Sequence, residues 1–364
     1  MKRKKPLVVS VVGARPQFIK LAPLARKMSR RLGHVIVHTG QHYDRMMSDV
    51  FFRQLNIPKP DYNLGVGSGS HGWMTGRIMT RLEKLLAEMC PDFVLVYGDT
   101  NSTLAGALTA AKLHLPVGHV EAGLRSYRPD MPEEINRRLA DHVSQLLFCP
   151  TVQSVKNLNS EGVRKGIVRS GDLMYELIAV GKERIARNTR ILKMHRLAPK
   201  EFLTMTMHRA ENVDTEENLD KIAGILFSLD YPVIFPVHPR TQKNLRRCGL
   251  LAHLKNSPDI ILTEPVSYLD NLSLIYHARA VLTDSGGVQK ESVFLGTPCL
   301  TLRDETEWVE TLARGNHLVG LSSRKILSVL KALRPPARQA SYLVKGRAPS
   351  EIIVSSLTDY LRRQ

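Results

Sequence analysis

The sequence predicts an α/β protein of two domains, each built on a parallel sheet whose strands alternate with helices. Its 364 residues are long for one domain. Short apolar, β-branched runs such as Phe93–Tyr97 recur along the chain between amphipathic segments, which is typical of βα units with buried parallel strands. This alternation pauses at Gly171 and Asp172 and then resumes. We therefore expect a first domain over residues 1–171 and a second over residues 172–349.

The composition is that of an ordinary globular protein, with 43% hydrophobic and 24% charged residues. No apolar run approaches the roughly 20 residues that cross a bilayer, so we expect no membrane partner. The apolar stretch Leu7–Ala14, after the basic start of the chain, meets Arg15 instead of a small-residue cleavage site. We interpret it as a first strand.

The net charge of +18 invites a nucleic-acid interpretation. The basic residues are spread along the chain, however, and no recognition-helix, zinc-finger or RNA-binding motif accompanies them. We expect no nucleic-acid partner. A basic surface that helps to attract an anionic phosphate ligand is the better interpretation.

Cysteine and histidine spacing argues against disulfides and metals. The four cysteines lie far apart in or next to apolar segments, without a CxxC pair, which indicates buried free thiols in a reducing cytoplasm. They are Cys90, Cys149, Cys248 and Cys299. His38, His42 and Asp44 have a faintly ligand-like spacing, but they follow a strand in a loop, and we expect no metal site.

The first βα unit starts with the strand at Leu7 and continues through a tight loop into a helix. Gly13 allows a close backbone turn, and Pro16 suits a first helical turn. Arg15 and Lys20 are candidates for facing an anion near that helix N-terminus. Further on, GSGSHG fits the dinucleotide pattern GxGxxG, but no buried strand precedes it and no acidic residue ends the next strand. We therefore reject a dinucleotide site there.

Two carboxylates follow neighbouring predicted strands in the middle of the first domain. Asp99 comes after the strand Phe93–Tyr97, and Glu121 ends the next short strand, VGHVE. Parallel neighbours deliver both acids to one rim of the sheet, where open α/β sheets place their ligands. Two acids on one rim indicate acid/base chemistry. Taken singly, each is equally well explained as a helix N-cap or as the partner of a lysine.

Glu133 and Arg137 open the next predicted helix, which we expect to run to about Leu147 before the strand LLFCPT. Their spacing of four residues is equally consistent with an ordinary helix ion pair and with a functional role. After the domain boundary, a helix from Met174 to about Arg196 is rich in Lys and Arg. We interpret it as an exposed connector.

The second domain repeats the same pattern, with polar clusters after its strands. His208 follows the strand in FLTMTMHRAEN and His238 follows the strand in YPVIFPVHPRT. Each histidine by itself is equally consistent with a structural role. Because both clusters follow predicted strands, we expect them at the ligand-binding rim.

The segment AVLTDSGGVQKES predicts an anion site. Gly286 and Gly287 expose backbone N–H groups at a helix N-terminus, and the Ser285 hydroxyl adds a donor. Glu291, one turn into that helix, is suited to accept hydrogen bonds from a ribose diol. A Gly-rich helix start without a ligand is the alternative.

Taken together, the two domains have strand ends that we expect to face each other across a cleft. One domain carries acids and the other an anion cradle, which suits a nucleotide diphosphate with a reactive group. The sequence has no tyrosine–lysine pair, NAD fingerprint or metal motif. We therefore expect acid/base or elimination chemistry without an added cofactor.

A family resemblance rests on nine ordered motifs between Gly13 and Trp308: GARPQFIKLAP, QHYD, YGDTNSTLAG, GHVEAGLRS, MPEEINR, MHRAEN, PVHPRT, TDSGGVQKES and LRDETEW. With them the sequence resembles the non-hydrolysing UDP-N-acetylglucosamine 2-epimerases over most of its length. The resemblance implies two Rossmann-like domains of the glycosyltransferase B type, with a C-terminal helix, residues 350–364, packing back on the first domain. It also implies a homodimer without an added cofactor.

The reaction that the resemblance implies is inversion at C2 of the sugar, by elimination of UDP to a 2-acetamidoglucal and re-addition. Glu121 and Glu133 then act as the acid/base pair at C2, with Asp99 beside them. The other implied roles are stabilisation of the departing diphosphate by Arg15, Lys20, Arg137 and His208, phosphate binding by Ser285, Gly286 and Gly287, ribose binding by Glu291, and contact with the nucleotide side of the cleft by His238.

Some motifs depart from the commonest family pattern. The segment TEWVE has Trp308 where many members read TERPE, and QHYD at Gln41–Asp44 replaces the QHR loop of many bacterial members. GARPQFIK and ETEW also resemble the branch that acts on UDP-2,3-diacetamido-2,3-dideoxy-glucuronate. We expect a cytoplasmic enzyme that makes UDP-ManNAc from UDP-GlcNAc for surface polysaccharide or glycoprotein synthesis. The same epimerisation of the diacetamido uronate and a glycosyltransferase on this scaffold are the alternatives.

Overall fold

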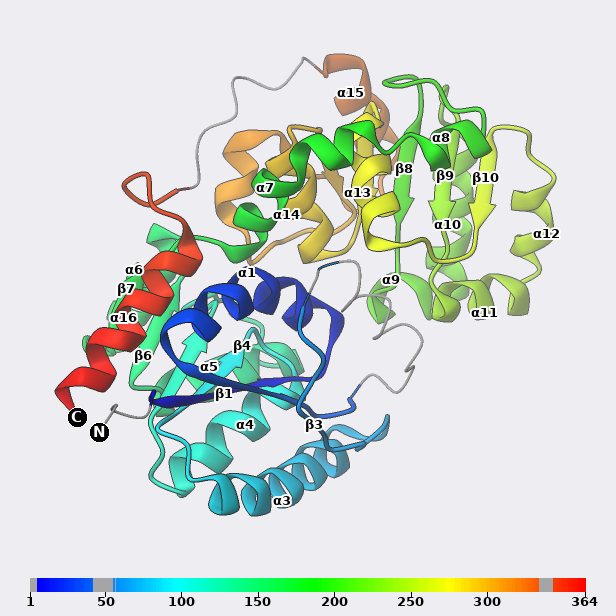
Figure 1. Cartoon of the computed structure of the whole chain (residues 1–364). Helices are drawn as coiled ribbons and strands as arrows, with labels where there is room; N and C mark the ends of the chain where they lie inside the picture. The colour runs from blue at the N-terminus through cyan, green and yellow to red at the C-terminus, as the bar shows by residue number, and fades with distance from the viewer. Residues whose placement is uncertain (1–4, 42–54, 56, 334–342) are drawn as a thin grey trace. The chain divides into compact units, whose positions relative to one another are not determined.

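The computed structural model of the chain describes residues 5–41, 55, 57–333 and 343–364. It forms two units (Figure 1). The first comprises Met1–Leu177 and Ser341–Gln364, and the second comprises Ile178–Ala340. The chain passes from the first unit to the second inside helix α7 (Leu173–Arg187), which starts directly after the pause in the sequence pattern.

The first unit contains a parallel sheet whose described strands have the order β3-β2-β1-β4-β5-β6-β7. The chain moves outward from β1 to β3 and then returns to start again at β4, so the strand order reverses between β1 and β4. Open α/β sheets bind ligands at such a switch point, beyond the carboxyl ends of the strands. The strands are β1 Leu7–Val12, β2 Gly33–His38, β3 Tyr62–Asn63, β4 Phe93–Tyr97, β5 Val117–Val120, β6 Leu146–Cys149 and β7 Ile167–Arg169.

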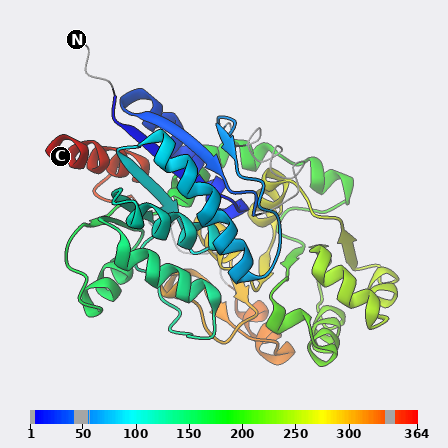
Figure 2. The same ribbon diagram turned by 90° about the horizontal axis from the view of Figure 1, so that it is seen from below.

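Helices cover the sheet of the first unit because its central strands are apolar on both faces. All five residues of β4 are buried, for example. Helix α4 packs on β1 and β4, and α3 packs on α4, as Figure 2 shows from below. The helices are α1 Arg15–Arg31, α3 His71–Met89, α4 Asn101–Lys112, α5 Pro132–Val143, α6 Val152–Ser160, the start of α7, and α16 Pro349–Arg363.

Helix α5 is shorter than the sequence predicts, since it ends at Val143 and not near Leu147. Ser144 is extended, and its hydroxyl donates to the carbonyl of Ala140 at 2.7 Å. Gln145 then bonds to β5 through both its backbone N–H and its side-chain oxygen. These contacts end the helix four residues before the predicted position and lead the chain into β6 at Leu146.

The second unit contains a parallel sheet whose described strands have the order β10-β9-β8-β11-β12-β13. Its switch point lies between β8 and β11. The strands are β8 Leu203–Thr206, β9 Val233–Pro236, β10 Ile260–Thr263, β11 Ala280–Thr283, β12 Cys299–Thr301 and β13 Asn316–Leu318. The helices after α7 are α8 Arg190–Met194, α9 Ala210–Val213, α10 Glu216–Phe227, α11 Pro239–Arg247, α12 Leu250–Lys255, α13 Tyr268–His277, α14 Gly286–Leu295, the 3₁₀ helix η1 Val309–Arg314 and α15 Ser323–Ala332.

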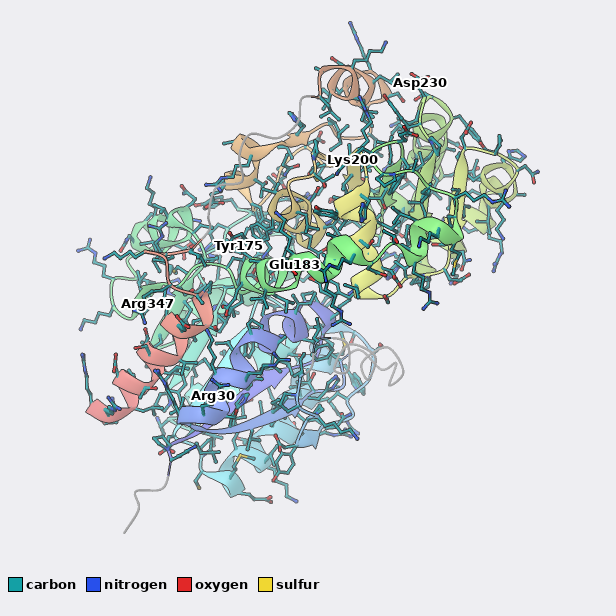
Figure 3. The ribbon with its side chains drawn as sticks, turned by 45° about the horizontal axis from the view of Figure 1, so that its top comes forward. Arg30, Tyr175, Glu183, Lys200, Asp230 and Arg347 are labelled. Carbon is teal, nitrogen blue, oxygen red and sulfur yellow. The ribbon has the colours of Figure 1, made fainter. Side chains whose placement is uncertain are left out.

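The predicted connector helix from Met174 to Arg196 is broken into α7 and α8. The break occurs at Asn188, whose side chain donates to Asp270 at 2.9 Å and whose carbonyl accepts from the Ser273 hydroxyl, both on α13. The connector is also less exposed than predicted, because Ile191 and Leu192 of α8 are buried. Glu183, labelled in Figure 3, does lie on an exposed face of α7.

Lys200, also labelled in Figure 3, joins the segment after α8 to the end of α13. Its ammonium donates to the carbonyls of Tyr276 and Ala278 at 2.6 and 3.0 Å, and burial lowers its pKa. This lysine is therefore a structural contact of the second unit and not part of a solvated basic face.

The last helix, α16, belongs to the first unit and packs on α1 (Figure 1). Tyr360 of α16 contacts the edge of Phe93 in β4, with ring centroids 5.4 Å apart. At the start of α16, Glu176 of α7 accepts from the Ser350 N–H at 2.8 Å and from its hydroxyl at 2.5 Å. Lys27 of α1 lies 3.0 Å from Glu351. The chain's two ends are thus joined in one unit.

The sequence predicted that all four cysteines are buried, and this prediction was wrong for two of them. Cys149 and Cys299 are buried, and burial raises the pKa of each thiol to about 12. Cys248 is half-buried, and Cys90 is exposed because it ends α3 in a left-handed conformation.

No described helix has the length and apolar character that a membrane span requires. Within the described ranges there is likewise no group of three or more histidine, cysteine or acidic side chains that could hold a metal ion. His42 and Asp44, which were considered above as ligands, lie outside the described residues.

Candidate functional site

The two predicted acids of the first unit follow adjacent strands, the first of which, β4, borders the switch point. Asp99 lies just beyond β4 and Glu121 directly follows β5, and the last residues of these strands, Tyr97 and Val120, are paired. Glu121 has a φ of 74°, a left-handed conformation that few residues with a side chain adopt. The sheet therefore brings both carboxylates to one rim, as the sequence predicts.

Lys20 and Glu121 form an ion pair in this rim. Their side chains are only 8% and 10% exposed. A Cβ atom on Gly98, which has a φ of +64°, would lie 2.8 Å from the Lys20 ammonium and 3.4 Å from the Glu121 carboxylate. Glycine is therefore required where the β4 loop passes the pair, and the two side chains also line a small pocket with Pro150.

Arg137 ties Asp99 to helix α5. Its guanidinium pairs with Asp99 through one nitrogen and with Glu134 through the other, the latter at 2.6 Å. Glu134 also accepts from the backbone N–H and the hydroxyl of Ser126, at 2.8 and 2.9 Å. Sequence reasoning missed Glu134, which is 2% exposed. The adjacent pair Glu133–Glu134 gave no indication of which acid faces inward.

Glu133 differs from the other acids of the site. It is half-buried in the first turn of α5, and its carboxylate makes no hydrogen bond or ion pair with any described residue. The three predicted acids therefore have three environments. Asp99 is paired with Arg137, Glu121 is paired with Lys20, and Glu133 is unpaired within that part of the chain.

The start of α1 is held closely against β4. Gln17 accepts from the N–H groups of Gly13 and Ala14, and its amide donates to the Tyr97 carbonyl at 2.9 Å. A Cβ atom on Gly13 would overlap the hydroxyl oxygens of Thr39 and Ser102, so no larger residue fits. Arg15, the predicted anion ligand, is the first residue of α1 and is half-buried.

A buried charged cluster that the sequence did not reveal lies behind the two acidic loops. His119 of β5, which is fully buried, bonds to Asp141 through Nδ1 and to the Gly98 carbonyl through Nε2, each at 2.7 Å. Asp141 also accepts from Arg125 at 2.7 Å. Burial opposes ionisation of Asp141, but the charges and hydrogen bonds of His119 and Arg125 hold its pKa below the usual range.

The predicted anion cradle of the second unit lies at the N-terminus of α14, after β11. Ser285 is the N-cap residue, and Gly286 and Gly287 are the first helical residues. A Cβ atom on Gly286 would lie 2.5 Å from the Glu307 carboxylate and 3.3 Å from the Trp308 indole nitrogen. Glu291 is buried one turn into the helix. The backbone of this turn is therefore approachable only because the position carries no side chain.

Trp308 packs on a buried lysine. The ammonium of Lys290 lies 3.7 Å from the centroid of its ring. Glu307 beside it pairs with Arg303 at 2.9 Å. These side chains form one wall of the α14 turn.

Asp284 fixes the loop that carries His208, at the switch point between β8 and β11. It accepts from the backbone N–H groups of His208 and Arg209 at 3.0 and 2.8 Å, and its carboxylate lies 3.4 Å from the His208 ring nitrogen. Asp284 is fully buried. Burial opposes its ionisation, but the His208 ring and these N–H groups hold its pKa below the usual range.

His238 lies beside His208, with ring centroids 5.5 Å apart. It is the N-cap of α11, and its Nδ1 accepts from the Arg240 N–H at 3.2 Å. The neutral ring then carries its proton on Nε2. The second unit thus brings His208, His238 and the α14 turn to the same edge of its sheet, as predicted.

Comparison with known proteins places this geometry in a family. Residues 25–356 match the family model described as UDP-N-acetylglucosamine 2-epimerase. The chain is 48% identical over 337 residues to a UDP-N-acetylglucosamine 2-epimerase homolog of Methanococcus maripaludis, covering 92% of this chain and 94% of that protein. It is 45% identical over 329 residues to a UDP-2,3-diacetamido-2,3-dideoxy-D-glucuronate 2-epimerase of Pseudomonas aeruginosa, covering 88% and 90%.

Solved structures agree with the sequence comparisons. The UDP-GlcNAc 2-epimerase of Methanocaldococcus jannaschii, in complex with UDP-GlcNAc and UDP, matches with a TM-score of 0.88 and 39% identity, covering 97% of this chain and 99% of that one. A UDP-glucosyltransferase of Polygonum tinctorium matches with a TM-score of 0.61 at 15% identity, which shows a shared fold alone. The two parallel-sheet units are therefore the Rossmann-like domains of the glycosyltransferase B class, as predicted. Since the family model spans most of the sequence, the chain belongs to the UDP-N-acetylglucosamine 2-epimerase family.

Proposed function

We propose that this chain interconverts UDP-GlcNAc and UDP-ManNAc by eliminating UDP to a 2-acetamidoglucal and adding it back. The observation that carries the proposal is that three carboxylates of the first unit have three different environments: Asp99 is paired with Arg137, Glu121 is paired with Lys20, and Glu133 lies in the first turn of α5. Differently placed carboxylates are what acid and base roles at one carbon require. Family membership and the 39% identity to a protein solved with UDP-GlcNAc and UDP support the choice of substrate.

The first domain supplies the acid/base groups in this proposal. Glu121 and Glu133 exchange the proton at C2, and Asp99 lies beside them to hold or relay it. Lys20 balances the charge of Glu121 through their ion pair. Arg137, which is paired with Asp99, and Arg15, at the first turn of α1, stabilise the developing negative charge of the leaving diphosphate.

The second domain supplies nucleotide binding. The backbone N–H groups of Gly286 and Gly287 and the Ser285 hydroxyl bind phosphate oxygens, and Glu291 accepts hydrogen bonds from the ribose. His208, held by Asp284, donates to the diphosphate as it leaves, and His238 contacts the nucleotide.

The proposed steps balance without an oxidant or an added cofactor. One carboxylate removes the proton from C2, the C1–O bond breaks, and UDP leaves with the electron pair as C1 and C2 become doubly bonded. A second acid then protonates C2 on its other face while a phosphate oxygen of UDP re-forms the bond to C1. Electrostatic stabilisation of a leaving oxyanion typically contributes about 3–4 kcal/mol per well-placed donor.

A second candidate substrate is UDP-2,3-diacetamido-2,3-dideoxy-glucuronate. The observation that favours it is the 45% identity to a 2-epimerase with that name, over 88% of this chain. The ETEW motif with Trp308 also favours the diacetamido uronate, because it resembles the branch that acts on this substrate. The extra carboxylate of that substrate would change binding, while the chemistry at C2 would stay the same.

Proton NMR in deuterated water, with purified protein and UDP-GlcNAc and no added metal or NAD, tests the proposal. We expect UDP-ManNAc to accumulate with deuterium at C2. Turnover of only the diacetamido uronate would keep the mechanism and change the substrate. Transfer of the sugar to an added acceptor, or no reaction with either substrate, would contradict the proposed function.

We also propose that the enzyme is a cytoplasmic homodimer whose product serves surface polysaccharide or glycoprotein synthesis. The family resemblance supports the dimer, and four cysteines without a disulfide suit a reducing compartment. Light scattering of the purified protein checks the dimer against the chain mass of 40.9 kDa. A mass of one chain across the working concentration range would argue against it.

A further inference from the structure

We propose that His119, Asp141 and Arg125 form a buried positioning unit that fixes the two loops carrying Asp99 and Glu121. The inference rests on the proposed function, because it concerns how the acids of that reaction are held. His119 and Asp141 bond to backbone groups of Gly98 and Gly123, in the loops that carry the acids. Each acts through the backbone of the loops that carry the acids.

His119 is bonded as a double donor. The Gly98 carbonyl can only accept a hydrogen bond, so Nε2 of the ring must carry a proton. Asp141 has a pKa below the usual range and is therefore a carboxylate, so Nδ1 must donate as well. The ring consequently holds the Gly98 carbonyl in one orientation. The next residue along the chain is Asp99.

The same carboxylate holds the second loop. Asp141 accepts from the backbone N–H of Gly123 at 3.1 Å, two residues beyond Glu121. Both Glu121 and Gly123 have left-handed backbone conformations, with φ values of 74° and 79°. A side chain on Gly123 would overlap the Ser154 carbonyl, so the turn is closed against the protein. One buried group thus ties together the two loops that present the acids.

Arg125 completes the unit and connects it to α6. Besides Asp141 it binds Glu161 through two parallel hydrogen bonds of 2.7 Å and donates to the Leu124 carbonyl at 2.6 Å. Positive and negative charges alternate along the cluster from His119 to Glu161. The side chains of His119, Asp141 and Arg125 are fully buried.

Packing alone does not explain such a cluster. Burying several charges costs more free energy than filling the same volume with apolar side chains, so stability is a weak reason for this arrangement. What charges and directed hydrogen bonds add is a fixed geometry, and acid/base catalysis depends on it. A displacement of about 1 Å of a reacting group reduces a rate about 100-fold.

The test compares Asp141→Asn and His119→Gln with wild type, using three readouts: kcat, the KM for UDP-GlcNAc, and the ratio of released 2-acetamidoglucal to epimer. Asp141→Asn keeps the volume but cannot accept from His119, Gly123 and Arg125 together, so it loosens both loops. His119→Gln frees mainly the Gly98 loop. We expect kcat to fall about 100-fold and 10-fold, respectively, with KM and UDP affinity within about twofold. We also expect more of the intermediate to be released, because C2 is reprotonated more slowly.

His277→Gln is the matched control. His277 also bonds to a backbone carbonyl, that of Ala186 at 3.1 Å, but both residues belong to the second unit and neither is part of the loops that carry the acids. We expect it to leave all three readouts unchanged. If Asp141→Asn does not fold, Arg125→Lys provides a milder change that keeps the positive charge beside Asp141 and removes the paired contact with Glu161.

The outcomes separate this inference from the proposed function. A wild-type protein that does not exchange the C2 proton contradicts the proposed function. A wild-type protein that does, together with folded variants of normal kcat and product ratio, overturns the positioning role. If kcat and UDP affinity fall in equal proportion in Asp141→Asn, His119→Gln and Arg125→Lys, the cluster has a general structural role. This outcome would also overturn the positioning role.

Discussion

At the scale of single residues, the most informative contact is the ion pair of Lys20 and Glu121. The two residues are 101 positions apart in the sequence, and both side chains are at most 10% exposed. A buried pair of this kind contributes little as a pair, but removal of one partner leaves the other charge without compensation. We therefore expect a substitution of Glu121 to change both the turnover rate and the free energy of unfolding.

Glu121→Gln is expected to have two effects. Turnover should fall at least about 100-fold, because a proton-transferring carboxylate is lost. The free energy of unfolding should also fall by about 3–5 kcal/mol, because the Lys20 ammonium remains buried without an anion. Deuterium exchange at C2 measures the first effect and urea unfolding measures the second.

The double variant Lys20→Gln with Glu121→Gln separates these effects. It removes both charges, so stability should recover while turnover does not. Glu183→Gln, on the exposed face of α7, is the neutral control. Normal turnover in either Glu121 variant would show that this carboxylate does not act on the substrate.

The positions of the acids could be predicted from the sequence, but their partners could not. An apolar run that ends in a polar residue, as at Asp99 and Glu121, reveals a strand end because burial is periodic along the chain. The pairing of His119 with Asp141 depends instead on which strands become neighbours and on the phase of α5. Neither is encoded within a short window of sequence.

At the scale of the secondary-structure elements, the N-terminus of α14 illustrates what a local pattern can predict. The order strand, Ser-Gly-Gly, helix predicts a helix N-terminus at this point, and α14 does begin at Gly286 with Ser285 as its N-cap. The wall formed by Glu307 and Trp308 could not be predicted, because it comes from a loop after β12. The errors at α5 and at the α7–α8 break have the same origin, since Gln145 and Asn188 bond to β5 and α13.

Gly286→Ala should weaken UDP binding about tenfold, which corresponds to about 1.4 kcal/mol. The added methyl group meets the Glu307 carboxylate at 2.5 Å and narrows the approach to the backbone N–H groups. Calorimetric titration with UDP measures the effect. Gly224→Ala in α10, where a Cβ atom meets nothing within 4 Å, is the matched control. Equal UDP affinity in both variants would show that the phosphate groups of UDP do not bind at the N-terminus of α14.

At the scale of the whole molecule, two buried carboxyls contribute to the decrease of stability at acid pH. Asp141 and Asp284 have pKa values below the usual range in the folded protein. The pKa of an unfolded aspartate is about 3.9. Such a group stabilises the fold at pH values above this and loses its contribution as the pH falls through the lower, folded value.

The contribution of these two carboxyls to the free energy of unfolding should therefore be nearly constant between about pH 7 and pH 5 and should decrease steeply below about pH 4. Asp284→Asn should lower the free energy of unfolding at neutral pH. It should also make the decrease of this free energy below about pH 4 less steep, because one of the two carboxyls no longer titrates. Urea unfolding at several pH values measures both. Asp220→Asn, which removes an exposed carboxylate of α10, should leave the curve unchanged. The same acid slope in Asp284→Asn and wild type would refute this assignment.

The position of α16 has a consequence for synthesis on the ribosome. The first unit needs this helix, which packs on α1 and whose Ser350 donates to Glu176, yet α16 is translated after every other described helix and strand. The second unit is complete about twenty residues earlier. We expect it to become protease-resistant first in ribosome-bound chains of increasing length, and earlier resistance of the first unit would contradict this. The domain translated first would then be the last to be completed, and a chain cut short before Pro349 would carry a finished nucleotide domain beside an unfinished catalytic one.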